Sequence, residues 1–128
     1  MNARDYPDRL SLLGLRYHAR HGVHAHEKTD PQPFEVDVVL HADLSGAADR
    51  DELEATVDYA ALHDLVDAIV RGPSFDLIEA LAGAIARAVL RSTDPRVVAE
   101  VEVRVRKPQA LEGDLAGPEV LIRRRRDP

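Results

Sequence analysis

The sequence predicts an α+β fold, in which a four-stranded antiparallel sheet carries two helices on one face. Two segments near the start of the chain and two near its end alternate apolar and polar residues, which is the period of a strand. Two segments between them repeat apolar residues every three to four positions, which is the period of a helix. The 128 residues contain no repeat and no low-complexity linker. We therefore expect a single domain over residues 1–128, with flexible ends at 1–8 and 125–128.

The two N-terminal strands are predicted at residues 10–17 and 34–43. The first is short, and its apolar residues alternate at Leu13, Leu15 and Tyr17. The second separates its residues cleanly onto an apolar and a polar face: Phe34, Val36, Val38, Leu40 and Ala42 against Glu35, Asp37, His41 and Asp43. The acidic stretch that follows, residues 45–54, shows no alternation and is expected to be a crossover.

Two amphipathic helices follow. The apolar stripe of the first consists of Leu62, Leu65, Val66 and Ile69, and that of the second consists of Leu77, Ile78, Leu81, Ile85 and Val89. Thr56 or Asp58 is expected to cap the N-terminus of the first helix, and Asp76 that of the second, with Glu79 three residues later. The Gly-Pro at 72–73 and the Asp-Pro at 94–95 are expected to end the two helices.

The C-terminal strands are predicted at residues 97–106 and 119–124. The first has the clearest alternation in the chain, with valines on one face and charged residues on the other. Since two helices cover one face of the sheet, the charged face should meet water or charged partners. A four-stranded sheet also leaves two open edges, which proteins usually cover or pair, so we expect an oligomer.

The composition excludes several classes of function. The 17 basic and 23 acidic residues give a net charge of −6, which disfavours binding to nucleic acid or to a membrane surface. The four arginines at 123–126 are interpreted as a solvated tail. The absence of cysteine excludes disulfides, thiolate catalysis and cysteine-ligated zinc. No segment resembles a signal peptide or is long and apolar enough for a membrane helix, so the expected location is the cytoplasm.

Lys107 is the first candidate for chemistry. Fifteen of the 17 basic residues are arginine, so a lysine kept against this bias can mark a place where an amine must exchange a proton. Lys107 continues the parity of the valine face, and Pro108 ends the strand directly after it. The amine would then be partly removed from water and suited to acid/base work. The alternative is a surface lysine whose stem covers the valines while its ammonium reaches solvent.

Three further features have both a structural and a functional interpretation. Four histidines lie within residues 18–26, and His24 and His26 have the spacing of a metal site, although a solvated loop without metal is the favoured interpretation. Glu79 either completes the Asp76 capping box or holds a ligand near a helix start. Tyr59 is either a core aromatic residue or a phenol that transfers protons.

Five motifs in their order and spacing resemble the dihydroneopterin aldolase family. The resemblance covers residues 10–124 and rests on His21-Gly22-Val23 with Glu27, Phe34-Glu35-Val36-Asp37-Val38, Thr56-Val57-Asp58-Tyr59, Leu77-Ile78-Glu79 and Val103-Arg104-Val105-Arg106-Lys107-Pro108. It implies the tunnelling fold, with subunits joined edge to edge in a tetrameric ring and two rings stacked into an octamer. It also implies the retro-aldol cleavage of 7,8-dihydroneopterin in folate biosynthesis, without a metal, another cofactor or a Schiff base.

The resemblance also implies roles for single residues. Lys107 would be the general acid/base, acting with water, and Tyr59 would assist protonation of the intermediate from across a subunit boundary. Glu27 would lie near the substrate side chain and the lysine. Glu79 would anchor the pterin through a bidentate, charge-assisted pairing, aided by backbone groups around Ile78 and Val57.

The chain departs from the family pattern in two places. Residues 111–114 read Leu-Glu-Gly-Asp where the family usually has an Ile-Pro pair, and Asp76 stands where some members have asparagine. Alternative functions on the same fold are a dihydroneopterin or dihydroneopterin-triphosphate epimerase, an oxygenase, or a zinc enzyme of the pyruvoyl-tetrahydropterin synthase type that uses His24 and His26. A pterin-binding protein without turnover would keep Glu79 and lose the proton shuttle.

Overall fold

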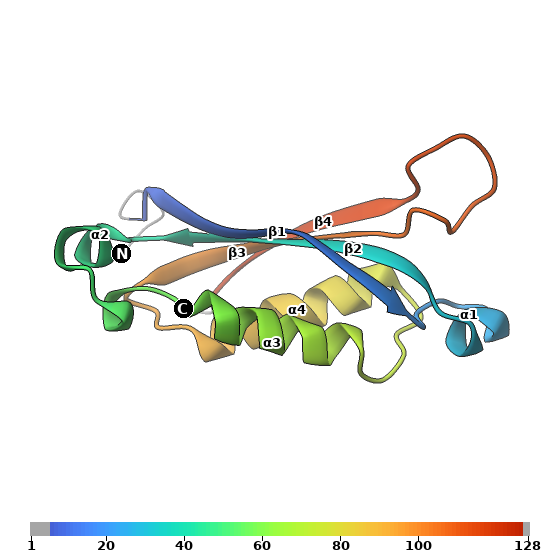
Figure 1. Ribbon diagram of the computed structural model, residues 1–128, viewed down its shortest axis with the longest axis horizontal. Coiled ribbons are helices and arrows are strands. Elements are labelled where there is room, and N and C mark those ends of the chain that lie inside the picture. The colour runs from blue at the N-terminus through green and yellow to red at the C-terminus, as the bar shows by residue number, and fades with distance from the viewer. Residues whose placement is uncertain (1–5, 127–128) are drawn as a thin grey trace.

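The computed structural model describes residues 6–126 and confirms the predicted α+β fold (Figure 1). Two long helices lie side by side against one face of a twisted sheet. In chain order the elements are β1 (Asp8–Ala19), α1 (Ala25–Thr29), β2 (Gln32–Ala42), α2 (Ser45–Arg50), the 3-10 turn η2 (Leu53–Ala55), α3 (Tyr59–Val70), α4 (Ile78–Ser92), β3 (Val98–Arg106) and β4 (Glu119–Arg125).

The sheet has the order β1-β2-β3-β4, and every neighbouring pair is antiparallel. The register of β1 against β2 shifts between Leu12 and Leu15. Gly14 lies at this shift with a φ of 70°, and its N–H donates to Asp37 Oδ1 at 2.6 Å. A left-handed backbone is easily adopted by glycine, so the bulge keeps the apolar residues on either side of it directed toward the same face.

The core lies between the sheet and the two long helices. The alternation in β2 and β3 places the predicted apolar faces against α3 and α4, and these side chains have almost no exposed surface: Phe34, Val36, Val38, Leu40, Val101, Val103 and Val105 from the sheet, and Leu62, Val66, Leu81, Ile85 and Val89 from the helices. The predicted core is therefore confirmed for β2, β3 and most of the two helix stripes. Two predicted apolar positions are wrong: Leu13 is 67% exposed because it lies at the register shift of β1, and Leu77 is 49% exposed because it precedes the first turn of α4.

Two short helices were not predicted. The histidine-rich segment, expected as a loop, contains α1, where Glu27 reaches back to the N–H of His24 in a capping box. The expected crossover at 45–54 contains α2 and η2. Both helices span only one or two turns, which is too short for an apolar stripe to develop in the sequence.

The structure decides between the two predicted caps of α3 and corrects the predicted cap of α4. Asp58, rather than Thr56, caps α3, because its carboxylate accepts from the N–H groups of Ala60 and Ala61 at 3.1 and 3.2 Å. The prediction that Asp76 caps α4 is wrong. Leu77 occupies the N-cap position of α4 without a side-chain hydrogen bond, and Asp76 instead pairs with Lys28.

The sheet face opposite the helices carries a ladder of ion pairs. Arg106 of β3 lies between Glu35 of β2 and Glu119 of β4, at 3.4 and 2.7 Å. Further along the sheet, Glu100 receives Arg123 and Arg125 of β4 at 2.8 and 3.0 Å. The charged residues on this face thus neutralise one another across neighbouring strands.

The described parts of the two ends contact the body of the molecule, and the flexibility expected of 1–8 and 125–128 stays a prediction. Tyr6 is buried and its hydroxyl donates to Pro95 O at 2.8 Å, and Asp8 accepts from the N–H of Leu44 at 2.9 Å. Arg125 belongs to β4, and Arg126 donates to carbonyls at the end of α4. Residues 1–5 and 127–128 lie outside the described residues. Among the described helices, none has the length and hydropathy to cross a membrane.

The packing predicts which leucines stabilise the fold. Leu81 has no exposed surface, so Leu81→Ala should lower the free energy of unfolding by about 2–5 kcal/mol, through lost apolar burial and the cavity left behind. Leu53→Ala is the control, because that side chain is 62% exposed and should change stability by less than about 0.5 kcal/mol. Urea denaturation at a fixed protein concentration measures both, and equal losses would contradict the assignment of the core.

Candidate functional site

Lys107 and Glu27 form a buried ion pair. Lys107 follows the last residue of β3, and its Nζ lies 2.6 Å from Oε2 of Glu27 in α1. Each residue is 9% exposed. The predicted parity of Lys107 is correct, because its side chain leaves the strand on the valine side, where Nζ lies 5.7 Å from the ring centroid of Phe34. The Lys107 side chain is only 11% exposed and its ammonium is paired with Glu27, so the interpretation as a solvated surface lysine is wrong.

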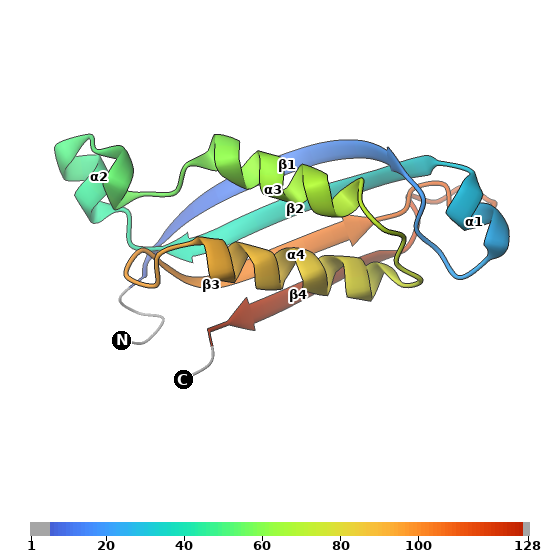
Figure 2. The same cartoon turned by 90° about the horizontal axis from the view of Figure 1, so that it is seen from below.

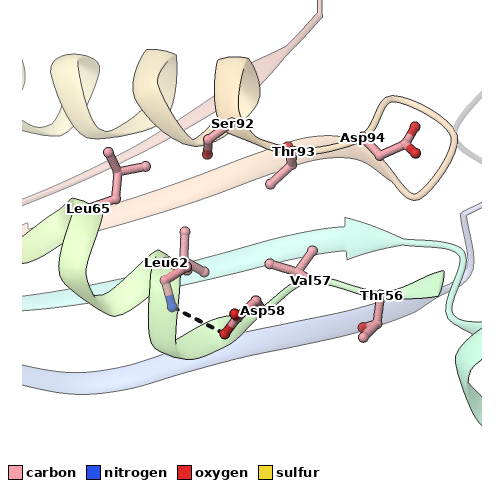
Figure 3. Close-up of a pocket in the computed structure, with 9 residues that line it drawn as sticks. Thr56, Val57, Asp58, Leu62, Leu65, Ser92, Thr93 and Asp94 are labelled. Atoms are coloured by element: carbon pink, nitrogen blue, oxygen red, sulfur yellow. Dashed lines mark hydrogen bonds between the residues drawn. The ribbon is translucent and has the colours of Figure 1, made fainter. Parts of the chain in front are cut away.

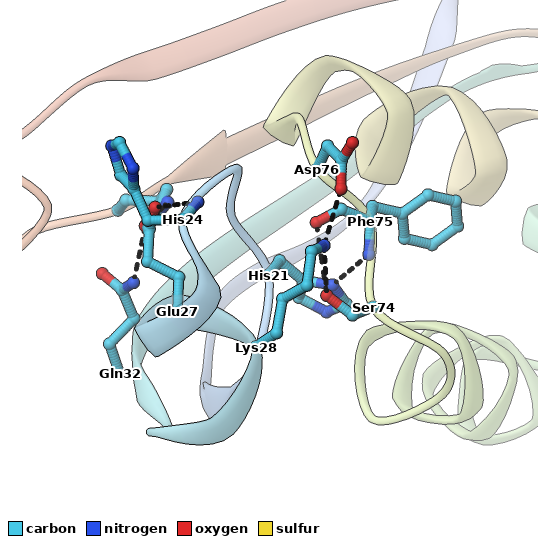
Figure 4. A network of polar contacts seen from close by, with 9 residues as sticks. His21, His24, Glu27, Lys28, Gln32, Ser74, Phe75 and Asp76 are labelled. Carbon is cyan, nitrogen blue, oxygen red and sulfur yellow. Dashed lines mark hydrogen bonds and ion pairs between the residues drawn. The ribbon is translucent and has the colours of Figure 1, made fainter.

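Glu27 is held by donors from three directions. Besides Lys107, the Nε2 of Gln32 donates to Oε2 at 3.1 Å, and the N–H of His24 donates to Oε1 at 3.3 Å (Figure 4). Together these donors lower the pKa of Glu27 to about 2, and the hydrogen bond from Lys107 is the largest cause. Their effect outweighs that of burial, which raises the pKa. Gly22 faces the same carboxylate, and a Cβ at this position would overlap the side chain of Glu27. The site therefore contains a fully ionised carboxylate with a fixed orientation.

The loop after β3 returns directly to Lys107. The N–H of Lys107 donates to Pro118 O at 3.0 Å, just before β4 begins. Gly117 has a φ of 96°, and a Cβ there would overlap the carbonyl oxygen of Lys107. Glycine is thus required at position 117 both for its backbone conformation and for this close approach. The two contacts close the loop at its base and fix the backbone of the lysine.

His21 joins the segment that carries Glu27 to the turn between α3 and α4. Its Nε2 lies 2.7 Å from Val70 O, and its Nδ1 accepts from the N–H of Phe75 at 3.0 Å. Since Nδ1 is an acceptor, the proton is on Nε2 and the ring is neutral. Burial is the main cause that lowers the pKa of His21 below the ordinary value of 6.5. The N–H of Gly22 also donates to Phe75 O at 2.9 Å.

Lys28 and Asp76 form a second connection between the same two segments. Lys28 Nζ lies 2.6 Å from Asp76 Oδ1 and donates to Ser74 Oγ at 3.2 Å (Figure 4). Both partners of this ion pair are at least partly exposed, so the pair contributes little to stability. The pair links α1, which carries Glu27, to the residues directly before α4.

Ile78 and Glu79 occupy that first turn. Ile78 is buried, whereas Glu79 is exposed, and no ion pair or hydrogen bond engages its carboxylate within residues 6–126. The backbone N–H groups of a helix start are not all used within the helix. A free carboxylate beside free N–H groups can bind a ligand that presents both donors and acceptors.

Val57 and Tyr59 lie at the opposite end of the molecule. Both are at the start of α3, whereas α1 and the end of β3 lie beyond the other end of this helix (Figure 1). Twelve residues of α-helix span roughly 18 Å, which exceeds the reach of a tyrosine side chain. Tyr59 is 64% exposed. One chain therefore brings Glu27 and Lys107 together and connects them to Ile78 and Glu79, but it keeps Val57 and Tyr59 apart from them.

Val57 borders a separate cavity of about 410 Å³ (Figure 3). The cavity lies between the start of α3 and the end of α4, and its lining includes Leu62, Leu65, Thr93 and Asp94. It is large enough for a small molecule or for part of one. The two ends of the folded molecule thus carry different residues of the predicted site.

Gln32, Gly22 and His21 also contribute to the site, and none of them was predicted to do so. The His-Gly pair was visible as part of a motif, but no pattern indicated that its imidazole joins two turns. The rings of His24 and His26 stack at 5.7 Å, and within residues 6–126 no group of three or more His, Asp or Glu side chains is placed to hold a metal ion.

A buried ammonium–carboxylate pair, connected to an open helix start on a four-stranded α+β sheet, is an arrangement typical of enzymes that transfer protons. The family model for FolB, dihydroneopterin aldolase, matches residues 10–123. The chain belongs to the dihydroneopterin aldolase family and has its tunnelling fold.

Relatives and solved structures agree with this assignment. The chain is 43% identical to the dihydroneopterin aldolase of Streptomyces coelicolor, over 80% of this chain and 84% of that protein. It is 38% identical to that of Bacillus subtilis, over 79% and 82%. The structure matches Escherichia coli dihydroneopterin aldolase in complex with neopterin with a TM-score of 0.83 and 26% identity, covering 91% of this chain and 98% of that one. It matches the enzyme from Burkholderia thailendensis bound to guanine with a TM-score of 0.74 and 26% identity, covering 95% and 93%.

The environment of His21 predicts a pH dependence of stability. Its pKa is lowered in the folded state, so the unfolded chain binds the proton first, and the free energy of unfolding should fall as the pH drops below about 6.5. Glu27 stays ionised there because its pKa is about 2. Urea denaturation between pH ~7 and ~5 measures the effect, with His21→Asn as the comparison that removes this imidazole and keeps the other five histidines. An equal pH dependence in both proteins would contradict this role.

Proposed function

We propose that this enzyme cleaves 7,8-dihydroneopterin by a retro-aldol reaction into 6-hydroxymethyl-7,8-dihydropterin and glycolaldehyde, a step of folate biosynthesis. The observation that carries the proposal is the buried Lys107 amine 2.6 Å from the ionised Glu27, in a member of the dihydroneopterin aldolase family. The reaction needs a group that removes and returns protons, and a buried amine fixed by a carboxylate supports this assignment. We place the enzyme in the cytoplasm, as one domain over residues 1–128.

The reaction breaks one carbon–carbon bond in the substrate side chain. The proton of a side-chain hydroxyl leaves, glycolaldehyde departs, and the electron pair of the broken bond enters the pterin ring. The ring acts as the electron sink, so the proposal includes no metal, no other cofactor and no Schiff base. A proton must then return to the carbon that remains on the ring. Lys107, acting with water, is proposed to carry out these transfers, and Glu27 to hold the amine and the side-chain hydroxyls in place.

Glu79 is proposed to bind the pterin. The amino group and the adjacent ring N–H of a pterin form a pair of parallel donors, and a carboxylate accepts both. Glu79 is exposed and has no partner within the described residues, which supports this role. The backbone around Ile78, at the start of α4, would contribute further hydrogen bonds. The Lys28–Asp76 ion pair then sets the separation between the pterin anchor and the acid/base pair.

Val57 and Tyr59 are proposed to reach the substrate from a second copy of the chain. Tyr59 lies a helix length from Lys107 and is exposed, so it can act at a site that another copy provides. The strands β1 and β4 each have one edge that no strand of this chain pairs within the described residues. Pairing of these edges would close a ring, which supports a tetramer or octamer with sites at the subunit boundaries. Tyr59 would assist protonation of the ring-stabilised intermediate.

The first experiment is an anaerobic incubation with 7,8-dihydroneopterin in the absence of added metal. The expected products are 6-hydroxymethyl-7,8-dihydropterin, resolved by chromatography, and an equal amount of glycolaldehyde. A product epimerised at C2′ beside them would be a side activity of the same pocket. Epimerised substrate alone would overturn the proposal in favour of an epimerase, and bound but unchanged substrate would overturn it in favour of a binding protein.

Replacement of the amine should separate binding from turnover. Lys107→Ala is expected to lower kcat by roughly 10²–10⁴-fold, because the proton-transfer group is gone, while pterin affinity changes little. Glu79→Gln is the matched variant with the opposite pattern, because a neutral amide cannot accept both donors with full charge and pterin affinity should fall. Fluorescence titration with neopterin and steady-state assays measure the two quantities. Full cleavage by Lys107→Ala would refute the role of the lysine.

Mixed assemblies test whether one site uses two copies. Lys107→Ala and Tyr59→Phe should each be impaired, and each retains the residue that the other lacks. After the two variants are unfolded and refolded together in equal amounts, about one quarter of the sites should combine an intact Lys107 with an intact Tyr59 from a neighbour. The assay should then recover about that fraction of the wild-type rate. A mixture no more active than the average of the two variants would show that each site lies within one chain.

A further inference from the structure

A second site lies at the end of the molecule remote from Lys107. A cavity of about 540 Å³ opens between the last turns of α4 and the end of β4. The end of β3, which Lys107 directly follows, lies near the beginning of α4, at the other end of that helix (Figure 2). The residues that line the cavity are a single leucine and five arginines: Leu90, Arg87, Arg91, Arg124, Arg125 and Arg126.

Two elements bring these arginines together. Arg87 and Arg91 are four residues apart on α4, so they lie on the same side of the helix. In β4, Val120 and Ile122 pack against the core, and by the same alternation Arg124 points to the helix-covered face. Figure 2 shows β4 running alongside α4 on this face. The guanidinium groups therefore approach one cavity from both of its walls.

Most of the five arginines in this arginine pocket have no acidic partner within residues 6–126. Arg123 and Arg125 pair with Glu100, whereas Arg87, Arg91 and Arg124 form no ion pair with any residue between 6 and 126. Like charges four residues apart on a helix repel one another, so this placement is unfavourable unless an anion joins them. This concentration of positive charge occurs in a chain whose net charge is −6.

Arg126 gives the pocket a fixed wall. Its guanidinium donates to Thr93 O at 3.0 Å, to Val98 O at 3.1 Å and to Leu90 O. These acceptors are carbonyl oxygens at the end of α4 and the start of β3, so Arg126 is held without a carboxylate. The arginines at 123–126, interpreted from the sequence as a solvated tail, are thus part of the folded surface.

We propose that the arginine pocket binds a small oligophosphate anion, either free or as part of a nucleotide. Guanidinium groups pair with phosphate oxygens in a bidentate fork. Arg87 and Arg91 have no carboxylate partner within residues 6–126, and neither has Arg124, which donates one N–H to Arg123 O at 2.7 Å. These three guanidinium groups match a ligand with two or three linked phosphates. The cavity is of the size that holds small molecules, and Leu90 offers an apolar surface to the rest of the ligand. A chain of nucleic acid is disfavoured, because the rest of this acidic protein would repel it. The pocket shares no residue with the site of the proposed reaction, so binding of the anion can be measured apart from cleavage.

Calorimetric titration of the full-length protein with inorganic triphosphate tests the proposal. Saturable binding is expected, with an affinity that falls as salt is added. The double variant Arg91→Gln/Arg124→Gln should weaken binding by at least about tenfold, because two charge-assisted contacts are lost. The double variant Arg50→Gln/Arg71→Gln is the matched control; it removes the same charge from arginines that lie outside the pocket and pair with Glu52 and Asp67. Its affinity should stay within about twofold of the wild type.

Further titrations distinguish a nucleotide from a free oligophosphate, and a ligand site from a contact between copies. Tighter binding of a nucleoside triphosphate than of triphosphate would support the proposal with a nucleotide as the ligand, and equal binding would support it with free oligophosphate. No saturable binding, or equal weakening in both double variants, would overturn it. The proposal would also be overturned if the wild type bound no triphosphate and light scattering showed a changed assembly state in Arg91→Gln/Arg124→Gln. The arginines would then form a contact between copies. Circular dichroism verifies that each variant is folded.

Discussion

The buried pair of Lys107 and Glu27 is the constraint that organises this end of the molecule. Two charges removed from water are costly unless further donors and good geometry compensate them. Here Gln32 and the backbone of His24 complete the hydrogen bonds of the carboxylate, Gly22 leaves space for it, and the ring of Phe34 faces the ammonium. The pair also joins the end of β3 to α1, which are 80 residues apart in the chain. A five-residue helix that could not hold its position alone is thereby fixed against the sheet.

The turn between α3 and α4 extends this constraint toward the start of α4. Neutral His21 is hydrogen-bonded to the carbonyl of Val70 and to the N–H of Phe75. Lys28 pairs with Asp76, two residues before α4 begins. Two adjacent residues of one segment, Glu27 and Lys28, contact Lys107, which directly follows β3, and Asp76, which precedes α4 by two residues. A displacement of α1 would therefore move both contacts. The chemistry of the amine and the position of Glu79 are therefore mechanically linked, whereas Tyr59, at the far end of α3, is free to belong to another copy's site.

Sequence patterns predicted the sheet and the two long helices. They also predicted the side on which Lys107 lies, because the alternation of side chains between the two faces continues for one residue beyond the end of β3. They did not predict α1 or the partner of Asp76, since such short elements are fixed by tertiary contacts with Glu27 and Lys28 rather than by periodicity. The motif around Asp76 and Glu79 had the spacing of a capping box, and the competing ion pair was formed by a residue 48 positions away. The grouping of Glu27, Glu79 and Tyr59 came from the resemblance, because no local pattern relates residues on different elements.

The loop between Lys107 and Pro118 is closed at its base by one backbone hydrogen bond and by the contact that Gly117 permits. Beyond this closure its residues are largely exposed, among them Leu111 and Leu115. Insertions, deletions and substitutions within such a loop leave its anchor points in place. Evolution can therefore vary the length and chemistry of this loop while the amine of Lys107 keeps its position beside Glu27.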